Sequence, residues 1–183
     1  MSSTPLVHLQ SANGSSPAHD LLTRQFRVIA LEAPPDGGRE AARVTARAIE
    51  SLGLADFDLM ATGDGSVAAL WLALEQPERV RALVLESPTA IGGAEPRDGE
   101  LERRLPELKT PTLVLFGTAD RPEAQETGRV YTGLIPNSHL VFVYDAAHAI
   151  GRDRPEAFAE VVADFLERHE AFIISRTPTV LHP

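Results

Sequence analysis

Residues 59–80 read LMATGDGSVAALWLALEQPERV: a short apolar run, a tight turn and a longer apolar segment. Small residues, Ala61 and Gly65, stand at the two ends of the turn, as a sharp passage from strand to helix requires. The segment Ser66–Glu75 is almost wholly apolar, which is typical of a helix buried at the centre of a domain. This stretch therefore predicts a buried strand that turns abruptly into a buried helix.

The same alternation continues along the chain. Six short runs are rich in Val, Leu, Ile or Phe: Leu6–Gln10, Phe26–Leu31, Phe57–Ala61, Ala82–Glu86, Thr112–Gly117 and Leu140–Tyr144. Runs that are apolar on both faces are typical of parallel strands buried on both sides of a sheet. The sequence therefore predicts an α/β fold, a doubly wound and mainly parallel sheet of about six strands with helices on both faces.

Segments with helical periodicity lie between these runs. Glu40–Leu52 carries one apolar stripe, and the last helix has an expected N-cap at Asp153 with Pro155 in its first turn. Residues 88–106 show no clear period. We expect a loop there, with at most one short helix over Glu100–Leu105.

Composition restricts the classes of function. The 183 residues carry a formal net charge of −9, which argues against nucleic-acid partners and anionic membrane surfaces. The chain has no cysteine, which excludes thiolate nucleophiles and cysteine metal sites. No metal or cofactor is expected, because five of the six histidines show no metal-ligand spacing: His8, His19, His139, His169 and His182. Neither a secretion signal nor a membrane span is recognisable, which favours a cytoplasmic protein.

Residues 59–80 resemble the nucleophile elbow of the α/β-hydrolase superfamily, where a small-x-nucleophile-x-small turn joins a strand to a helix. Pro77–Val80, which reads Pro-Glu-Arg-Val, resembles the sequence that often ends this helix in the family. Anchored there, the elbow spans Ala61–Gly65, and its nucleophile position falls on Gly63. The family uses Ser, Cys or Asp at this position, so the resemblance implies an elbow without its nucleophile.

Two further segments resemble the loops that carry the other members of the family's catalytic triad. Pro111–Asp120 is similar to the strand and turn that carry the acid, which falls on Asp120. Ala146–Ala149 is similar to the histidine loop, and the triad histidine falls on His148. The resemblance covers roughly residues 5–168 and implies that His148 and Asp120 meet in space.

The oxyanion side of the resemblance is altered. After its first buried strand the family usually has His-Gly, where this chain reads Gln10-Ser11-Ala12. The backbone N–H groups of Ala12 and Asp64 are the candidate donors, but a carboxylate at Asp64 opposes a developing oxyanion unless it is protonated or turned away. The family's first two strands have no counterpart here, and only a loop stands where a lid often sits.

Ordinary covalent ester hydrolysis is not expected without a serine at Gly63, because deleting that nucleophile costs about a millionfold in kcat in a well-studied protease. We interpret His148 with Asp120 as a base that activates water or removes a proton from a small organic carbonyl or ester compound, with Asp64 tuning the site. Two alternative nucleophiles stay open. Asp64 lies one residue too late in the elbow, and Ser66 is better explained by a capping role at the start of the helix. The main rival is a non-catalytic relative that binds a small molecule or a protein in the old pocket.

The expected organisation is a single domain over residues 1–170 and an apolar tail over residues 171–183. The run Phe26–Leu31 should lie at an open sheet edge, and exposed edges invite pairing. We expect the tail to cover that edge, either docked in the same chain or exchanged with a second one. This arrangement favours a homodimer.

Overall fold

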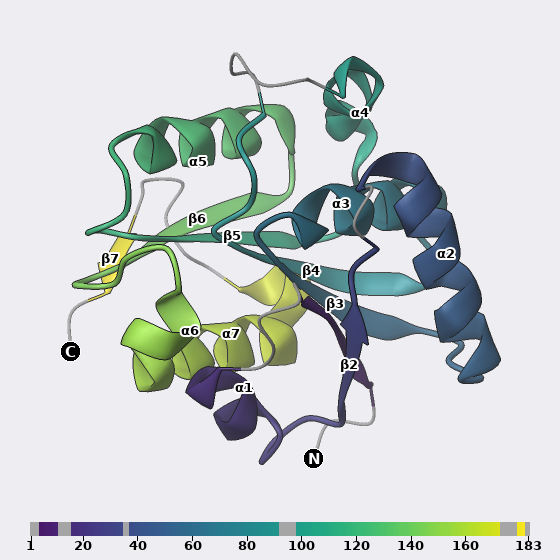
Figure 1. The fold of residues 1–183 in the computed structure, drawn as a ribbon, viewed down its shortest axis with the longest axis horizontal. Helices are drawn as coiled ribbons and strands as arrows, with labels where there is room; N and C mark the ends of the chain where they lie inside the picture. Colours follow the sequence, from purple (N-terminus) through teal and green to yellow (C-terminus); the bar gives the residue numbers. More distant parts are fainter. Residues whose placement is uncertain (1–3, 11–15, 35–36, 92–97, 173–178, 182–183) are drawn as a thin grey trace.

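The computed structural model describes residues 4–10, 16–34, 37–91, 98–172 and 179–181, which contain a seven-stranded parallel sheet. The strand order is β2-β1-β3-β4-β5-β6-β7 (Figure 1). The strands are β1 (Leu6–Gln10), β2 (Val28–Glu32), β3 (Phe57–Thr62), β4 (Val80–Glu86), β5 (Thr112–Gly117), β6 (Ser138–Val143) and β7 (Thr179–Leu181). The predicted fold class is confirmed, and each of the six predicted runs forms a strand.

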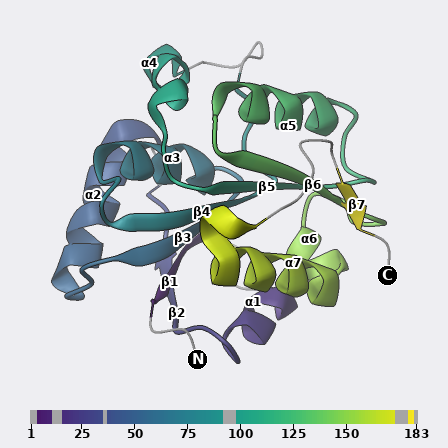
Figure 2. The same ribbon diagram turned by 180° about the vertical axis from the view of Figure 1, so that it is seen from behind.

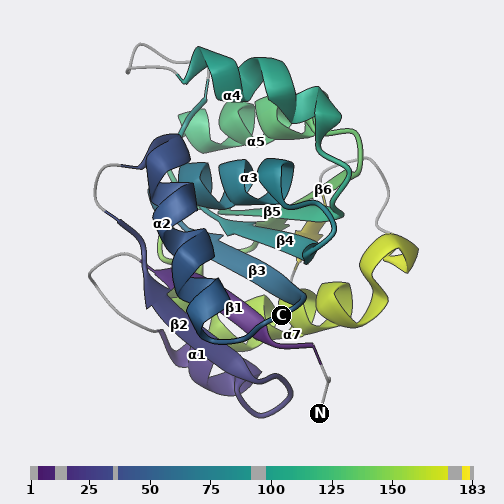
Figure 3. The same cartoon turned by 90° about the vertical axis from the view of Figure 1, so that its right-hand side faces the viewer.

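Helices cover both faces of the sheet. They are α1 (Pro17–Leu22), α2 (Gly38–Ser51), α3 (Gly65–Glu75), α4 (Gly99–Arg104), α5 (Glu123–Leu134), α6 (Ile150–Asp153) and α7 (Pro155–Arg168), with the 3-10 helices η1 (Leu105–Glu107) and η2 (His169–Ala171). Helices α2, α3 and α5 lie on one face, and α1, α6 and α7 on the other (Figures 1 and 3). Each face has its own buried apolar cluster, so the central strands are buried on both sides. Within this described part, none of the helices has the length and apolarity needed to cross a bilayer.

Helix α3 is buried at the centre of its layer, as its apolar sequence predicts. Trp71 on this helix is 1% exposed, and its indole N–H donates to Oδ2 of Asp98 at 2.7 Å. The guanidinium groups of Arg39 and Arg104 lie 4.9 and 5.7 Å from the centre of the Trp71 ring. Asp98 also caps α4 by accepting from the backbone N–H of Leu101 at 3.0 Å. The short helix predicted within residues 88–106 is therefore present, and Asp98 ties it to α3.

The start of α7 differs from the prediction. Asp153 ends α6 instead of capping α7, and its Oδ2 accepts from the backbone N–H of Ala147 at 2.9 Å. Arg154 precedes the first residue of α7, Pro155, and provides no side-chain cap. The expected acceptor therefore exists, but it stabilises the loop before His148 rather than the helix start.

The two edges of the sheet are formed by different parts of the chain, β2 at one edge and β7 at the other. Strand β2 lies at an edge, as predicted for the run Phe26–Leu31. The prediction that the tail covers this edge within the same chain is wrong, because β7 pairs with β6 at the opposite edge (Figure 2). Just before the tail's undescribed residues 173–178, Phe172 is 3% exposed and packs edge-to-face on the Phe165 ring, with the centroids 5.2 Å apart. Exchange with a second chain and the homodimer stay predictions.

Candidate active site

The turn between β3 and α3 has the backbone of a nucleophile elbow. Gly63 has a φ of +53°, in the left-handed region, and its N–H donates to the carbonyl oxygen of Glu86 at 3.0 Å. A Cβ built on Gly63 would meet no described atom within 4 Å, so this position faces open space. The elbow is thus present as geometry, and what it lacks is a reactive side chain.

Asp120 and His148 meet beyond the carboxyl ends of β5 and β6. Nδ1 of His148 lies 3.4 Å from Oδ2 of Asp120, whose other oxygen accepts from the backbone N–H of Arg121 at 2.7 Å. The Asp120 side chain is 4% exposed and the His148 side chain 56%. A separation of 3.4 Å is long for a hydrogen bond, and such pairs commonly tighten when substrate binds. With Nδ1 facing the carboxylate, Nε2 is the nitrogen left to accept a proton.

Two residues at the end of β4 hold the histidine loop in place. Oγ of Ser87 donates to the carbonyl oxygen of His148 at 2.8 Å, and Oε1 of Glu86 accepts from the N–H of Gly151 at 2.8 Å. Ser87 is fully buried and has a φ of +42°, a strained backbone of the kind that clusters at functional sites. Neither residue was predicted from the sequence. The available signal was a glutamate at the end of the otherwise apolar run Ala82–Glu86.

A cavity of about 680 Å³ opens over the elbow at the carboxyl ends of β1, β3 and β4. It is lined by Gln10, Ser16, His19, Thr62, Gly63, Asp64, Glu86, His148, Ala149 and Arg152. None of these lining residues is a large apolar one. The cavity therefore suits a compact polar compound better than a lipid chain.

Fold and sequence both connect this site to known proteins. The structure of MGS-MChE2, an α/β-hydrolase enzyme from a lagoon-sediment metagenome, matches with a TM-score of 0.74 and 19% identity, over 91% of this chain and 92% of that one. In sequence, the chain is 27% identical to mouse protein ABHD14A over 157 residues and 33% identical to the uncharacterized hydrolase YugF of Bacillus subtilis over 72 residues. The chain belongs to the α/β-hydrolase superfamily. No protein-family model matches the chain.

This α/β-hydrolase corresponds to only part of its curated relatives. The match covers 80% of this chain and 61% of ABHD14A, but 39% of this chain and 26% of YugF. The predicted superfamily is therefore confirmed, whereas these partial matches do not show the reaction.

A buried polar network lies beneath the cavity of this α/β-hydrolase. Glu86 is 2% exposed, and its Oε2 accepts from Oγ1 of Thr62 at 3.0 Å. The same hydroxyl lies 3.1 Å from Nε2 of His8, whose ring stacks on that of His19 with the centroids 4.1 Å apart. Burial raises the pKa of Glu86, and it lowers the pKa of His8 to about 3 and that of His19 to about 4. Both imidazoles are therefore uncharged at neutral pH. Their place in this buried network could not be recognised from the spacing of histidines in the sequence.

The predicted oxyanion and pocket residues fall in three groups. Gln10 and Asp64 line the cavity, and Ser11 and Ala12 lie outside the described residues. Ser66 is fully buried, is not among the lining residues, and its Oγ lies 3.2 Å from a threonine hydroxyl of the loop after β4. Ser66 therefore lies outside the lining of this cavity, and Asp64 rather than Ser66 occupies the N-cap position of α3.

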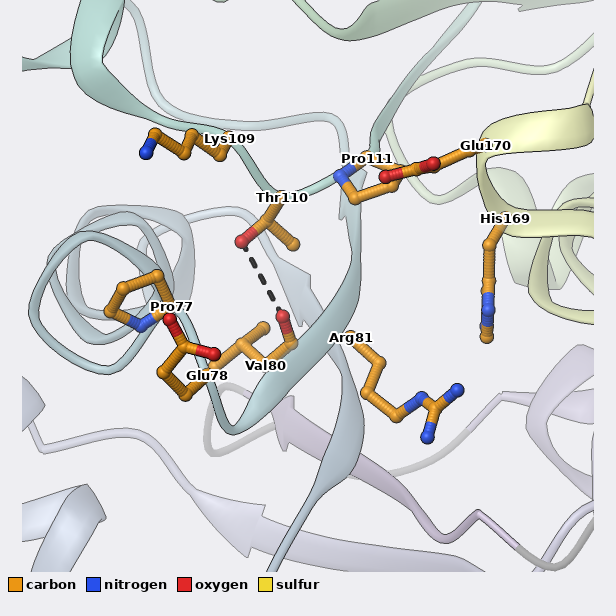
Figure 4. A pocket seen from close by; sticks show the side chains of 9 residues that line it. All are labelled: Pro77, Glu78, Val80, Arg81, Lys109, Thr110, Pro111, His169 and Glu170. Atoms are coloured by element: carbon orange, nitrogen blue, oxygen red, sulfur yellow. Dashed lines mark hydrogen bonds between the residues drawn. The ribbon is translucent and has the colours of Figure 1, made fainter.

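A second cavity, of about 490 Å³, lies at the amino ends of β4 and β5 (Figure 4). It is therefore at the opposite end of the strands from the cavity at His148. Arg81 and His169 line it, and Nε2 of His169 lies 3.2 Å from Oδ1 of Asp58. The Asp58 side chain is 1% exposed. Among the described residues, no three His, Asp or Glu side chains are grouped to hold a metal ion.

This buried carboxyl makes stability depend on pH. Burial raises the pKa of Asp58 to about 7, so the folded state keeps a proton that the unfolded state loses near pH 4. The stability that this proton contributes is lost as pH rises from 4 through 7. Asp58→Asn should therefore raise the free energy of unfolding by roughly 1–4 kcal/mol at pH 8, and by only about a third as much at pH 5, in urea denaturation.

The matched control is Asp56→Asn. Asp56 pairs with Arg81 at 2.9 Å, but its side chain is 47% exposed. We expect it to change stability by less than about 1 kcal/mol at either pH. Equal effects of Asp58→Asn at pH 5 and pH 8 would contradict the assignment.

Proposed function

We propose that this chain acts on a small polar carbonyl or ester compound without a covalent serine step, with His148 as the general base. The observation that carries this proposal is the His148–Asp120 pair, which stands at a cavity left open over Gly63. A water molecule or a substrate atom has room where the family's nucleophile would project.

In the proposed reaction, Nε2 of His148 takes a proton from water as the oxygen attacks a carbonyl carbon, or takes it from the carbon beside that carbonyl. Asp120 keeps the Nδ1 proton directed at its carboxylate and stabilises the imidazolium that forms. Ser87 supports this geometry by holding the His148 carbonyl at 2.8 Å. Asp64 lines the same cavity, and its negative charge adds to the field that favours the imidazolium.

The test uses p-nitrophenyl acetate as substrate. His148→Gln should lower kcat/KM by roughly 10²–10⁴-fold, the range of general-base catalysis, and Asp120→Asn should lower it less. His169→Gln, at the opposite end of the strands, controls for acyl transfer to an accessible imidazole. Full activity in His148→Gln would rule out the base. An acetyl group found on Asp64 or Ser66 by mass spectrometry would instead assign a covalent mechanism to that side chain.

The second candidate is a non-catalytic protein that binds a small molecule or a protein partner in this cavity. The missing side chain at Gly63 favours it, because the elbow geometry persists without its nucleophile. A wild-type rate equal to that of His148→Gln would support this second candidate.

A further inference from the structure

We propose that Glu86 holds a proton in the resting protein and delivers it into the cavity, as the acid partner of the base His148. This inference rests on the proposed function, because it assigns the second proton of the same reaction. It adds a catalytic residue from β4, a strand that carries none of the residues predicted from the sequence.

The surroundings of Glu86 favour a neutral carboxyl. Its two oxygens accept from the N–H of Gly151 and the hydroxyl of Thr62, both of which are uncharged donors. No ion pair of Glu86 occurs within the described part of the chain, and only 2% of the residue is exposed to water. Burying an unpaired carboxylate is costly, so the group retains its proton instead. Burial accordingly raises the pKa of Glu86.

The imidazoles below the cavity do not supply the missing positive charge. His8 reaches Glu86 only through Thr62, and burial keeps the pKa of His8 at about 3. Because the Thr62 hydroxyl donates to Glu86, its oxygen accepts from an Nε2–H of neutral His8. The network therefore fixes the orientation of the carboxyl without ionising it.

Glu86 also lies where a proton is needed. It lines the same cavity as His148, and its backbone oxygen accepts from the N–H of Gly63, under the open space of the elbow. An acid at the end of β4 and a base in the loop after β6 thus face the same cavity. In enzymes with a Ser-His-Asp triad, the histidine both accepts the proton of the nucleophile and donates a proton to the leaving group. Here two groups divide these two proton transfers.

Ester hydrolysis by this pair transfers two protons. Nε2 of His148 takes one proton from water while the water oxygen bonds to the carbonyl carbon. Glu86 gives its proton to the leaving alcohol oxygen as the carbon–oxygen bond breaks. The products are a carboxylic acid and an alcohol, and the protein is left with imidazolium and carboxylate. The positive charge of His148 lowers the pKa of Glu86, so this ion pair is favourable, and one proton passing back through water restores the starting state.

The alternative is that Glu86 has only a structural role. In that case the carboxyl serves only to hold the histidine loop through Gly151, and its protonation state has no consequence. Glu86→Gln separates the two roles. The amide oxygen can still accept from Gly151 and the amide N–H can donate to Thr62, but the side chain has no proton to release.

Infrared spectroscopy in D₂O detects the proton without any substrate. A protonated carboxyl has a carbonyl stretch that a carboxylate lacks. We expect this band at pH 8 in wild type and in Asp58→Asn, which removes the other buried carboxyl with a raised pKa. The band should vanish in Glu86→Gln. Its absence from Asp58→Asn at pH 8 would overturn the proposal, whether or not Glu86→Gln folds.

Two esters then test proton delivery. The ethoxide leaving from ethyl acetate needs a proton, whereas p-nitrophenolate is stable without one. Glu86→Gln should lower the rate with ethyl acetate on the order of a hundredfold more than the rate with p-nitrophenyl acetate. An equal loss with both esters would mean that Glu86 only positions the loop. His148→Gln should slow both esters, and if it slows neither, the proposed function fails while the infrared band still decides whether Glu86 holds a proton.

Discussion

Serine in place of Gly63 is expected to introduce a covalent nucleophile. The backbone already has the left-handed φ of +53°, and a Cβ added there meets no described atom within 4 Å. His148 and Asp120 are present to activate the new hydroxyl. We expect Gly63→Ser to react with a fluorophosphonate probe at residue 63, and to raise p-nitrophenyl acetate turnover on the order of a hundredfold. This is a small part of the millionfold that a complete triad provides, because the oxyanion side is altered.

Gly63→Ala is the matched control. It carries the same backbone cost, about 1–2 kcal/mol for a side chain in the left-handed region, but has no hydroxyl. It should be less stable than wild type by the same amount as Gly63→Ser and should remain unlabelled. Labelling of Gly63→Ser that persists after His148→Gln would show that the histidine does not activate this position. A folded but unlabelled Gly63→Ser would show that the elbow does not face the reactive pair.

Gly117→Ala should cause the largest loss of stability among the substitutions considered. Gly117 ends β5, and a Cβ there would overlap the carbonyl oxygen of Ala146 and lie 2.5 Å from that of Ala147. These are backbone atoms of the histidine loop, and the N–H of Ala119 holds the Ala146 carbonyl at 2.9 Å. The loop must therefore move away from Asp120. We expect a loss of about 3 kcal/mol or more, which corresponds to a fall in Tm of about 6 °C or more in calorimetry.

Gly133→Ala provides the contrast for Gly117→Ala. Gly133 lies in α5, is exposed, and its added Cβ would meet no described atom within 4 Å. Because Gly133 lies in the last turn of α5, alanine there should stabilise the chain by up to about 0.5 kcal/mol. A Gly117→Ala protein as stable as wild type would mean that the acid turn and the histidine loop are not packed as described.

Much of this architecture could be predicted because it is set by local pattern. The six apolar runs predict the strands, and the central ones are buried on both faces, whereas the edge strand β2 is only partly buried. The small residues Ala61 and Gly65 predict a sharp turn. The meeting of Asp120 and His148 came from the family resemblance rather than from any spacing. It is observed at 3.4 Å because parallel strands bring their carboxyl ends to one side of the sheet.

What could not be predicted depends on register and on long-range packing. Glu86 was seen only as the last residue of a run, and its place under the cavity follows from its pairing opposite Thr62 on β3. Asp153 was predicted to cap the last helix, and only the folded loop shows that it accepts from the backbone N–H of Ala147 instead. The docking of the tail on β6 rather than β2 likewise depends on a strand of three residues, too short to leave a pattern.

The backbone of Gly63 also bears on how many nucleotide exchanges separate this site from one with a serine. Half of the glycine codons become serine codons by exchange of a single nucleotide. Because the left-handed turn, the free space and the histidine–aspartate pair are already in place, this exchange needs no second change elsewhere in the described fold. Where the codon is of that kind, a population can pass between a glycine and a serine form of this site in one mutational step.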